Sequence, residues 1–228
     1  EDKGLYPLNE RVEEPFFAER NLTITELYKL GFETKFTFAN VYIPEFNIEK
    51  KIPKDNNYNS LKEFINALDT CNITSSLTGL NKYLDVDNYI KYHALTTILN
   101  NQDAYTNNFF LAKEYASSPF KVIPWDFDKA FIGDVGLYGE NEIIQKLKSS
   151  PLTKKMYLDE VKYQLENIFT LSEVSTYIDS LSIIISEAYK RDPYLGKDRY
   201  NLATEVNNLK NYITNRRQDL LNKIAAEN

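Results

Sequence analysis

Residues 83–131 read YLDVDNYIKYHALTTILNNQDAYTNNFFLAKEYASSPFKVIPWDFDKAF, and this stretch decides the fold around it. Over about residues 85–99, apolar and aromatic side chains recur at helical spacing in a broad stripe, which predicts a helix. Two short apolar segments, 108–113 and 120–124, are separated by a polar turn and predict a β-hairpin. The helix therefore delivers the chain to Asp103 just before the hairpin begins.

Two acidic motifs flank this hairpin. Asp103 precedes Asn108 by five positions, the interval of the D-x-x-x-x-N loop of phosphotransferases, and Asp126 and Asp128 follow the hairpin. Phosphoryl transfer needs a carboxylate that deprotonates the attacking hydroxyl and hard oxygen ligands that hold Mg²⁺. Asp103 would supply the first. Asn108 and Asp126 would supply the second, because the two ends of a hairpin are close in space, and Asp128 would add a further ligand.

The spacing alone is a weak signal, because Asp and Asn in loops most often cap helices or complete turns. The aromatic neighbours of Asp126 and Asp128 strengthen it. Carboxylates packed among Trp125, Phe127 and Phe131 would be costly to bury without a cation or hydrogen-bond partners. On an extended segment both carboxylates would face one side, with Phe127 anchored on the other. The residues alone leave a metal site and a structural role equally open.

Four short motifs occur in order along this stretch: Tyr83-Leu-Asp-Val-Asp, Asn100-Asn-Gln-Asp103, Asn108-Phe-Phe-Leu and Ile123-Pro-Trp-Asp-Phe-Asp-Lys-Ala-Phe131. Together they resemble the CotH family, atypical protein kinases of the spore coat protein H type. A weaker resemblance extends over nearly the whole chain, through Gly4-Leu-Tyr-Pro-Leu-Asn-Glu10 and the C-terminal helices. The chain departs from the family's common pattern at Asn107, where His is usual, and at Gln102, where Trp is usual.

The resemblance implies an α+β, mostly α-helical fold, the C-terminal lobe of an atypical protein-kinase-like fold with short β-hairpins. It also implies ATP with Mg²⁺ or Mn²⁺, and phosphorylation of Ser or Thr in an extracellular, cell-surface or spore-coat protein. By position, Asp103 would match the catalytic Asp, Asn108 and Asp126 the metal ligands, and Asp128 an accessory ligand. Glu10 would lie near the nucleotide hinge.

The phosphate-covering loop and the phosphate-binding Lys of kinases are expected upstream of Glu1. Lys29, Lys35 and Lys91 are available within the chain, but their surroundings favour surface positions. We therefore expect the chain to be the large C-terminal lobe, inactive as an isolated fragment. A non-catalytic surface adhesin or coat-assembly pseudokinase is the alternative, and a carboxylate-based glycosidase is weaker because Asn108 has no required role in it.

The remaining sequence predicts scaffold. We expect strands over residues 4–10, 35–43 and 46–52, and helices over 11–19, over a segment capped by Ser60, and over 141–148, 151–168, 171–191 and 198–226. We divide the chain into residues 1–58, 59–140 and 141–228. His93 and Cys71 are interpreted as packed or partly buried residues, and Arg216-Arg217 as solvated or ion-paired surface.

Composition excludes several classes of function. The chain has 228 residues, a formal net charge of -6 and a pI near 5.1, without a long basic run, which argues against nucleic acid as a partner. A single cysteine excludes an internal disulfide and a cysteine-rich zinc site. No apolar run approaches the ~20 residues of a membrane span. The expected partners are a nucleotide and a protein substrate.

Overall fold

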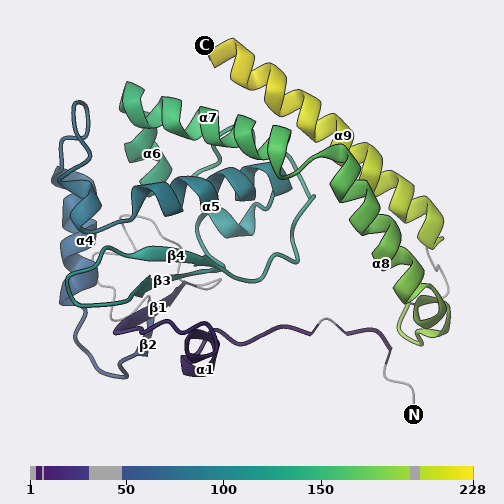
Figure 1. Cartoon of the computed structure of the whole chain (residues 1–228), viewed down its shortest axis with the longest axis horizontal. Helices are drawn as coiled ribbons and strands as arrows, with labels where there is room; N and C mark the ends of the chain where they lie inside the picture. The colour runs from purple at the N-terminus through teal and green to yellow at the C-terminus, as the bar shows by residue number, and fades with distance from the viewer. Residues whose placement is uncertain (1–3, 7, 31–47, 196–200, 228) are drawn as a thin grey trace. The chain divides into compact units, whose positions relative to one another are not determined.

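The computed structural model describes residues 4–6, 8–30, 48–195 and 201–227. The chain forms two compact units, which Figure 1 shows together. The first unit combines Glu1–Arg11 with Tyr163–Asn228, and the second is Val12–Lys162. The division expected from the sequence, at residues 58 and 140, stays a prediction.

The second unit contains a four-stranded antiparallel sheet with strand order β2-β1-β3-β4. Its strands are β1 (Glu26–Leu30), β2 (Glu49–Ile52), β3 (Phe109–Lys113) and β4 (Lys121–Pro124). The predicted hairpin is confirmed as β3–β4, with Phe109 opposite Pro124. β2 confirms the C-terminal part of the strand predicted over 46–52, whereas the strand predicted over 35–43 lies outside the described residues.

Strand β1 was missing from the sequence prediction, although it pairs with both β2 and β3. Leu27 and Tyr28 are consecutive and both fully buried, so the strand lacks the alternation of apolar and polar residues that marks a half-buried strand. The strand expected over residues 4–10 is wrong for the part of it that the structure describes. Gly4 has a φ of +81°, and the Leu5 amide donates to the Asp192 carboxylate at 2.9 Å instead of to a strand.

Helices α4 (Asn59–Thr70) and α5 (Val86–Leu99) cover one face of this sheet (Figure 1). The Phe120 ring lies 5.8 Å from Tyr28 of β1 and 5.7 Å from Phe64 of α4. The Val122 amide donates to the Asn88 side chain of α5 at 2.7 Å. Full burial of each large apolar side chain contributes about 2 kcal/mol, so these contacts fix the hairpin against α4, and the hydrogen bond to Asn88 fixes it against α5.

The opposite face packs against the short helix α1 (Glu14–Ala18), which lies within the helix predicted over 11–19. Phe110 of β3 is buried there in one cluster with Val12, Phe17, Leu27 and Ala112. Trp125 packs on the edge of this cluster, with its ring 5.8 Å from that of Phe110. The residue that precedes Asp126 is therefore anchored on the sheet.

The two helix starts predicted around the hairpin have different outcomes. Asp85 caps α5, because its carboxylate accepts the Asn88 amide at 3.0 Å. The predicted Ser60 cap of α4 is wrong, since the helix begins at Asn59 with Tyr58 at the cap position, and the Asn59 amide donates to the Asn57 side chain at 3.1 Å. The Ser60 hydroxyl donates to Glu26 of β1 instead.

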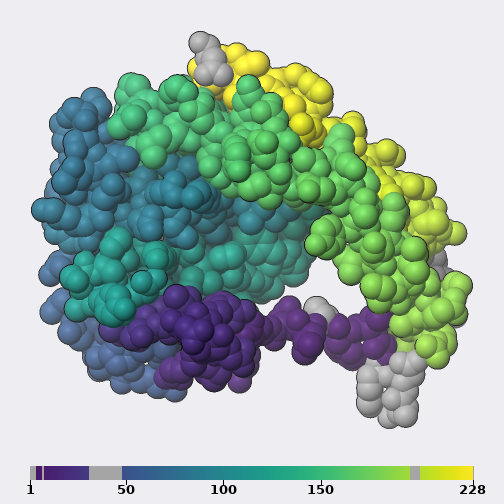
Figure 2. Space-filling model, in the orientation of Figure 1, coloured from purple at the N-terminus to yellow at the C-terminus, as the bar shows by residue number. Residues whose placement is uncertain are grey.

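The four C-terminal helices are confirmed within a few residues: α6 (Glu142–Lys148), α7 (Pro151–Asn167), α8 (Leu171–Arg191) and α9 (Leu202–Glu227). In the first unit, α8 and α9 lie side by side (Figures 1 and 2), and Lys210 pairs with Asp179 at 2.6 Å. Arg216 is ion-paired, one of the two predicted possibilities, because it lies 3.5 Å from Asp219. Its predicted position on the surface is wrong, since its side chain is only 6% exposed.

Among the described residues, no single helix combines the length and apolarity needed to cross a membrane, and only the bent pair α7–α8 meets the criterion jointly.

Candidate functional site

The Asp103 loop begins where α5 ends. Asn100 takes a left-handed conformation and terminates the helix, and a 3₁₀ turn over Asp103–Tyr105 follows. The Asn101 side chain accepts the Ala104 amide at 3.3 Å, and the Asn107 amide donates to the Asp103 carbonyl at 3.1 Å. The backbone around Asp103 is therefore fixed. Within the described part of the chain, the carboxylate of Asp103 makes no hydrogen bond or ion pair, so it is available as a proton acceptor.

Asn108 and Asp126 meet at the open end of the β3–β4 hairpin. The Trp125 amide donates to the Asn108 carbonyl at 3.1 Å, and the Asn108 side-chain Nδ2 donates to the Asp126 carbonyl at 3.4 Å. The Asn108 amide donates to Leu30 of β1 at 2.9 Å, which adds a third strand to the support. The structure thus brings together the two residues predicted as metal ligands, for the predicted reason that both ends of one hairpin are neighbours.

This hydrogen bond also orients the Asn108 amide. Because Nδ2 faces the Asp126 carbonyl, Oδ1 is the atom left for another partner, and it accepts no hydrogen bond from any described residue. Both residues have left-handed backbones, with φ of +58° for Asn108 and +54° for Asp126. Non-glycine residues in this region cost conformational energy and often mark functional sites.

The predicted burial of the acidic cluster is wrong. Asp126 and Asp128 are exposed, and Asp128 lies 3.8 Å from Lys129 with 60% of its side chain accessible. Phe127, the residue between them, turns inward as expected, and its ring packs edge-on against Tyr92 at 6.5 Å. The carboxylates therefore point outward, and the cost of burying them gives no support to a metal site.

The chemistry of the donor set fits Mg²⁺ bound together with a nucleotide. Across the described residues, no three His, Cys, Asp or Glu side chains are grouped to hold a metal ion alone. Mg²⁺ in phosphotransferases is commonly held by one or two protein ligands, with phosphates and waters completing its octahedron. The Asn108 amide oxygen and the Asp126 carboxylate would provide such a pair. Asp128 is near enough in sequence to add a ligand through water.

The other predicted contacts have mixed outcomes. Glu10 belongs to the first unit and the hairpin to the second, so its role at the nucleotide hinge stays a prediction. Lys91 is exposed and pairs with Asp87 one turn away at 2.6 Å. The Lys29 ammonium lies 5.9 Å from the centre of the Trp125 ring, and Lys35 is outside the described residues.

His93 is a core residue, as predicted. It is fully buried, its Nε2 donates to the Tyr138 carbonyl at 2.6 Å, and its Nδ1 lies 3.1 Å from the Tyr89 hydroxyl. Burial lowers the pKa of His93 to about 4, and the hydrogen bond to Tyr138 opposes this shift. His93 therefore supports the loop that contains Tyr138 and stays neutral at physiological pH. Cys71 is partly buried, which confirms its predicted environment.

The sequence reasoning missed the residues that hold segment 131–141, the stretch after the Asp126 motif. Asn141 caps α6 by accepting the Ile143 amide at 2.7 Å, and its Nδ2 donates to the Tyr105 carbonyl. The Tyr157 hydroxyl donates to the Leu137 carbonyl at 2.6 Å. The capping position of Asn141 before an apolar helix was the one signal in the sequence. Asn141 therefore attaches the segment to the turn that contains Asp103, and Tyr157 attaches it to α7.

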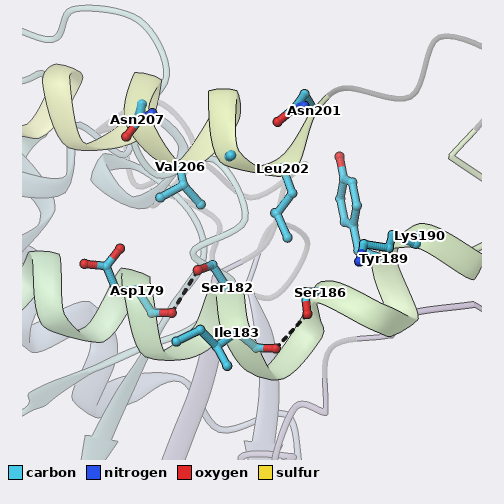
Figure 3. Close-up of a pocket in the computed structure, with 11 residues that line it drawn as sticks. Asp179, Ser182, Ile183, Ser186, Tyr189, Lys190, Asn201, Leu202, Val206 and Asn207 are labelled. Atoms are coloured by element: carbon cyan, nitrogen blue, oxygen red, sulfur yellow. Dashed lines mark hydrogen bonds between the residues drawn. The ribbon is translucent and has the colours of Figure 1, made fainter.

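A pocket of about 760 Å³ lies between α8 and α9 in the first unit (Figure 3). Ile183, Leu202 and Val206 give it an apolar centre. The hydroxyls of Ser182 and Ser186 donate to carbonyls of their own helix at 2.8 and 2.9 Å. The acidic residue of the pocket, Asp179, pairs with Lys210 at 2.6 Å, so we do not assign the reaction to this pocket.

Comparisons with known proteins identify the family of the chain. The inner spore coat protein H of Bacillus subtilis (strain 168) is 23% identical over 241 residues, an alignment that covers 98% of this chain and 67% of that protein. The sequence pattern of the family described as CotH kinase protein matches residues 1–220, a range that includes Asp103, Asn108 and Asp126. The chain belongs to the CotH kinase protein family.

Proposed function

We propose that the chain is the C-terminal lobe of an atypical protein kinase that transfers the γ-phosphate of ATP to Ser or Thr hydroxyls. The observation that carries this proposal is the meeting of Asn108 and Asp126 at the end of the hairpin. Family membership supports it, because the chain matches a family described as kinases over nearly all its length. A glycosyl transfer by two carboxylates would give the Asn108 amide no required role.

In this proposal, Asp103 is the general base. Its carboxylate accepts the proton of the protein hydroxyl as that oxygen forms a bond to the γ-phosphorus. The bond between the γ-phosphorus and the β,γ-bridging oxygen breaks, and ADP leaves. A divalent ion, Mg²⁺ or Mn²⁺, would neutralise the charge on the phosphate oxygens, and Asn108 and Asp126 would hold it there. The hairpin keeps these two ligands in register.

The substrate is proposed to be a secreted, surface or spore-coat protein. The supporting observation is the relative from Bacillus subtilis, which is an inner spore coat protein. The specific acceptor protein would be recognised by surfaces outside the site formed by Asp103, Asn108 and Asp126, since Asp103 would contact only the reacting hydroxyl.

The test uses the full-length protein that contains this chain, radiolabelled ATP and dephosphorylated casein as the acceptor. We expect Mg²⁺-dependent labelling of Ser or Thr, and Asp103→Asn should reduce kcat by about 10²–10⁴-fold, the range for loss of a general base. Asp126→Asn should mainly weaken binding of the metal–nucleotide complex, measured by titration calorimetry. Asp159→Asn is the matched control, because this exposed carboxylate lies on α7, pairs with Lys155 and has no role in the proposed site.

The outcomes separate the proposal from its alternative. Labelling that persists at the wild-type rate in Asp103→Asn would contradict the assignment of the base. Tight binding of the metal–nucleotide complex without any transfer, including to the protein itself, would favour a coat-assembly pseudokinase. Absence of both binding and transfer would remove the kinase proposal.

A further inference from the structure

Asn100 lies at the junction between α5 and the Asp103 loop. Its backbone is left-handed, with φ 52° and ψ 42°, and its side chain is fully buried. A left-handed residue after a helix satisfies the terminal carbonyls, and glycine serves this purpose as well as asparagine. The helix end alone therefore does not require the amide group of Asn100.

The amide group instead binds one loop from three directions. Its Nδ2 donates to the carbonyl of Ile132 at 3.2 Å and to the carbonyl of Gly133. Its Oδ1 accepts the Val135 amide at 3.0 Å. The Phe131 amide donates to the carbonyl of Leu99, at 2.6 Å, which adds a backbone contact at the same place. The loop over residues 131–135 is thereby fixed to the end of α5.

This contact joins the two halves of the proposed site. Asp103 follows Asn100 by three residues, and Ile132 follows Asp126 by six. The hairpin holds Asp126 to Asn108, but the hairpin bonds do not include Asp103. We propose that Asn100 is a positioning residue whose side chain sets the distance between the Asp103 carboxylate and the loop over residues 126–135, called the Asp126 loop below. The inference rests on the proposed kinase function.

Loss of this contact should affect turnover more than binding. Asn108 and Asp126 keep their hairpin support without Asn100, so the metal–nucleotide complex should still bind. The Asp126 loop would shift relative to Asp103, and a misplacement of about 1 Å can cost about 100-fold in rate. A purely structural residue would instead lower the amount of folded protein without changing kcat per folded molecule.

The informative variant is Asn100→Gly, because glycine keeps the left-handed backbone while it removes all three side-chain hydrogen bonds. Asn21→Gly is the matched control, since Asn21 has nearly the same φ, +54°, and is exposed. Asn100→Asp is the second variant. It keeps an acceptor for the Val135 amide but turns an oxygen toward the carbonyls of Ile132 and Gly133.

The test uses the full-length protein. We expect hydrogen exchange of the amides in residues 131–136 to accelerate by at least about tenfold in Asn100→Gly without any ligand, because buried hydrogen bonds protect amides. We also expect kcat to fall by about 100-fold while the Kd for Mg²⁺–ATP stays within about threefold. Asn21→Gly should leave all three measurements unchanged.

Each result decides a different claim. Faster exchange with an unchanged kcat would overturn the positioning role while leaving the kinase function in place. Equal losses of Mg²⁺–ATP affinity and kcat would also overturn the positioning role, because the Asn100 contacts would then support the whole site. If the wild-type protein shows no phosphate transfer, the proposed kinase function fails, whatever the exchange data show. Unchanged hydrogen exchange in Asn100→Gly would show that the Asn100 side chain does not hold the loop over residues 131–135. If Asn100→Gly does not fold, Asn100→Asp carries the test, and failure of both to fold would assign Asn100 a structural role only.

Discussion

Gly139→Ala should destabilise the protein far more than a typical loop substitution. Gly139 has a φ of +59°, and a Cβ there would lie 2.4 Å from Cε1 of Tyr105, where carbon atoms do not approach. This separation is about 1 Å short of ordinary carbon–carbon contact. Tyr105 cannot move away easily. It is 3% exposed, its hydroxyl lies 3.1 Å from that of Thr97, and its ring packs 5.0 Å from His93.

Two energy terms set the loss of stability expected for Gly139→Ala. Alanine in a left-handed backbone costs about 1–2 kcal/mol, and forcing extra volume into a packed site costs about 1–3 kcal/mol. Gly136 separates them, because its φ is +67° but nothing lies within 4 Å of the position of its Cβ. Gly136→Ala should therefore show only the backbone term. We expect Gly139→Ala to lower the free energy of unfolding by about 2 kcal/mol more than this control does.

Urea denaturation measures this difference, with the fluorescence of Trp125, the only tryptophan in the chain, as the probe. Trp125 and Gly139 belong to the same compact unit, so the probe reports on the affected region. Equal unfolding midpoints for the two alanine variants, at unchanged m-values, would refute the close packing of segment 131–141 on the Asp103 turn.

Two further predictions concern the site and its support. Mg²⁺ alone should bind at least about tenfold more weakly than in the presence of a nucleotide, because Asn108 and Asp126 supply only part of an octahedron. Calorimetric titration of the metal with and without a non-hydrolysable ATP analogue measures this difference. Equal affinities would contradict a site in which protein and nucleotide share the metal. The second is that acid should destabilise the core through His93, whose pKa falls from 6.5 to about 4 on folding because of burial. The unfolded chain then binds the proton more readily, so stability present above pH 6.5 is lost as the pH falls toward 4, at up to about 1.4 kcal/mol per pH unit. His93→Gln should flatten this part of the pH profile in urea denaturation, and an unchanged profile would show that His93 does not titrate there.

The part of the site that could be predicted from sequence depends on local pairing. A hairpin brings its two ends together whatever surrounds it, so the meeting of Asn108 and Asp126 followed from two apolar segments and a turn. The capping of α5 by Asp85 followed from local chemistry in the same way. Such features need only residues a few positions apart, or the fixed geometry of one motif.

The support of Asp103 could not be predicted, because its partners are distant in sequence. The Val135 amide and the Asn100 side chain are 35 positions apart, and Asn141 and the Tyr105 carbonyl are 36 apart. The side chain of an asparagine in a loop usually hydrogen-bonds within its own turn, so the presence of asparagine in the sequence does not indicate such a long-range contact. Strand β1 was missed for a related reason, since its two consecutive buried residues reflect neighbours on both faces.

The exposure of Asp126 changes the physical basis of the proposed metal site. The sequence placed both carboxylates among aromatic rings. In the structure Trp125 packs on Phe110 and Phe127 on Tyr92, and the backbone of Asp126 between them is left-handed, with a φ of +54°, so Asp126 and Asp128 are left exposed. A buried acidic cluster would need a permanent cation, whereas exposed carboxylates are stable in water without one. Metal binding at this hairpin should consequently require nucleotide phosphates. The site would then bind a metal–nucleotide complex and would not be a structural metal centre.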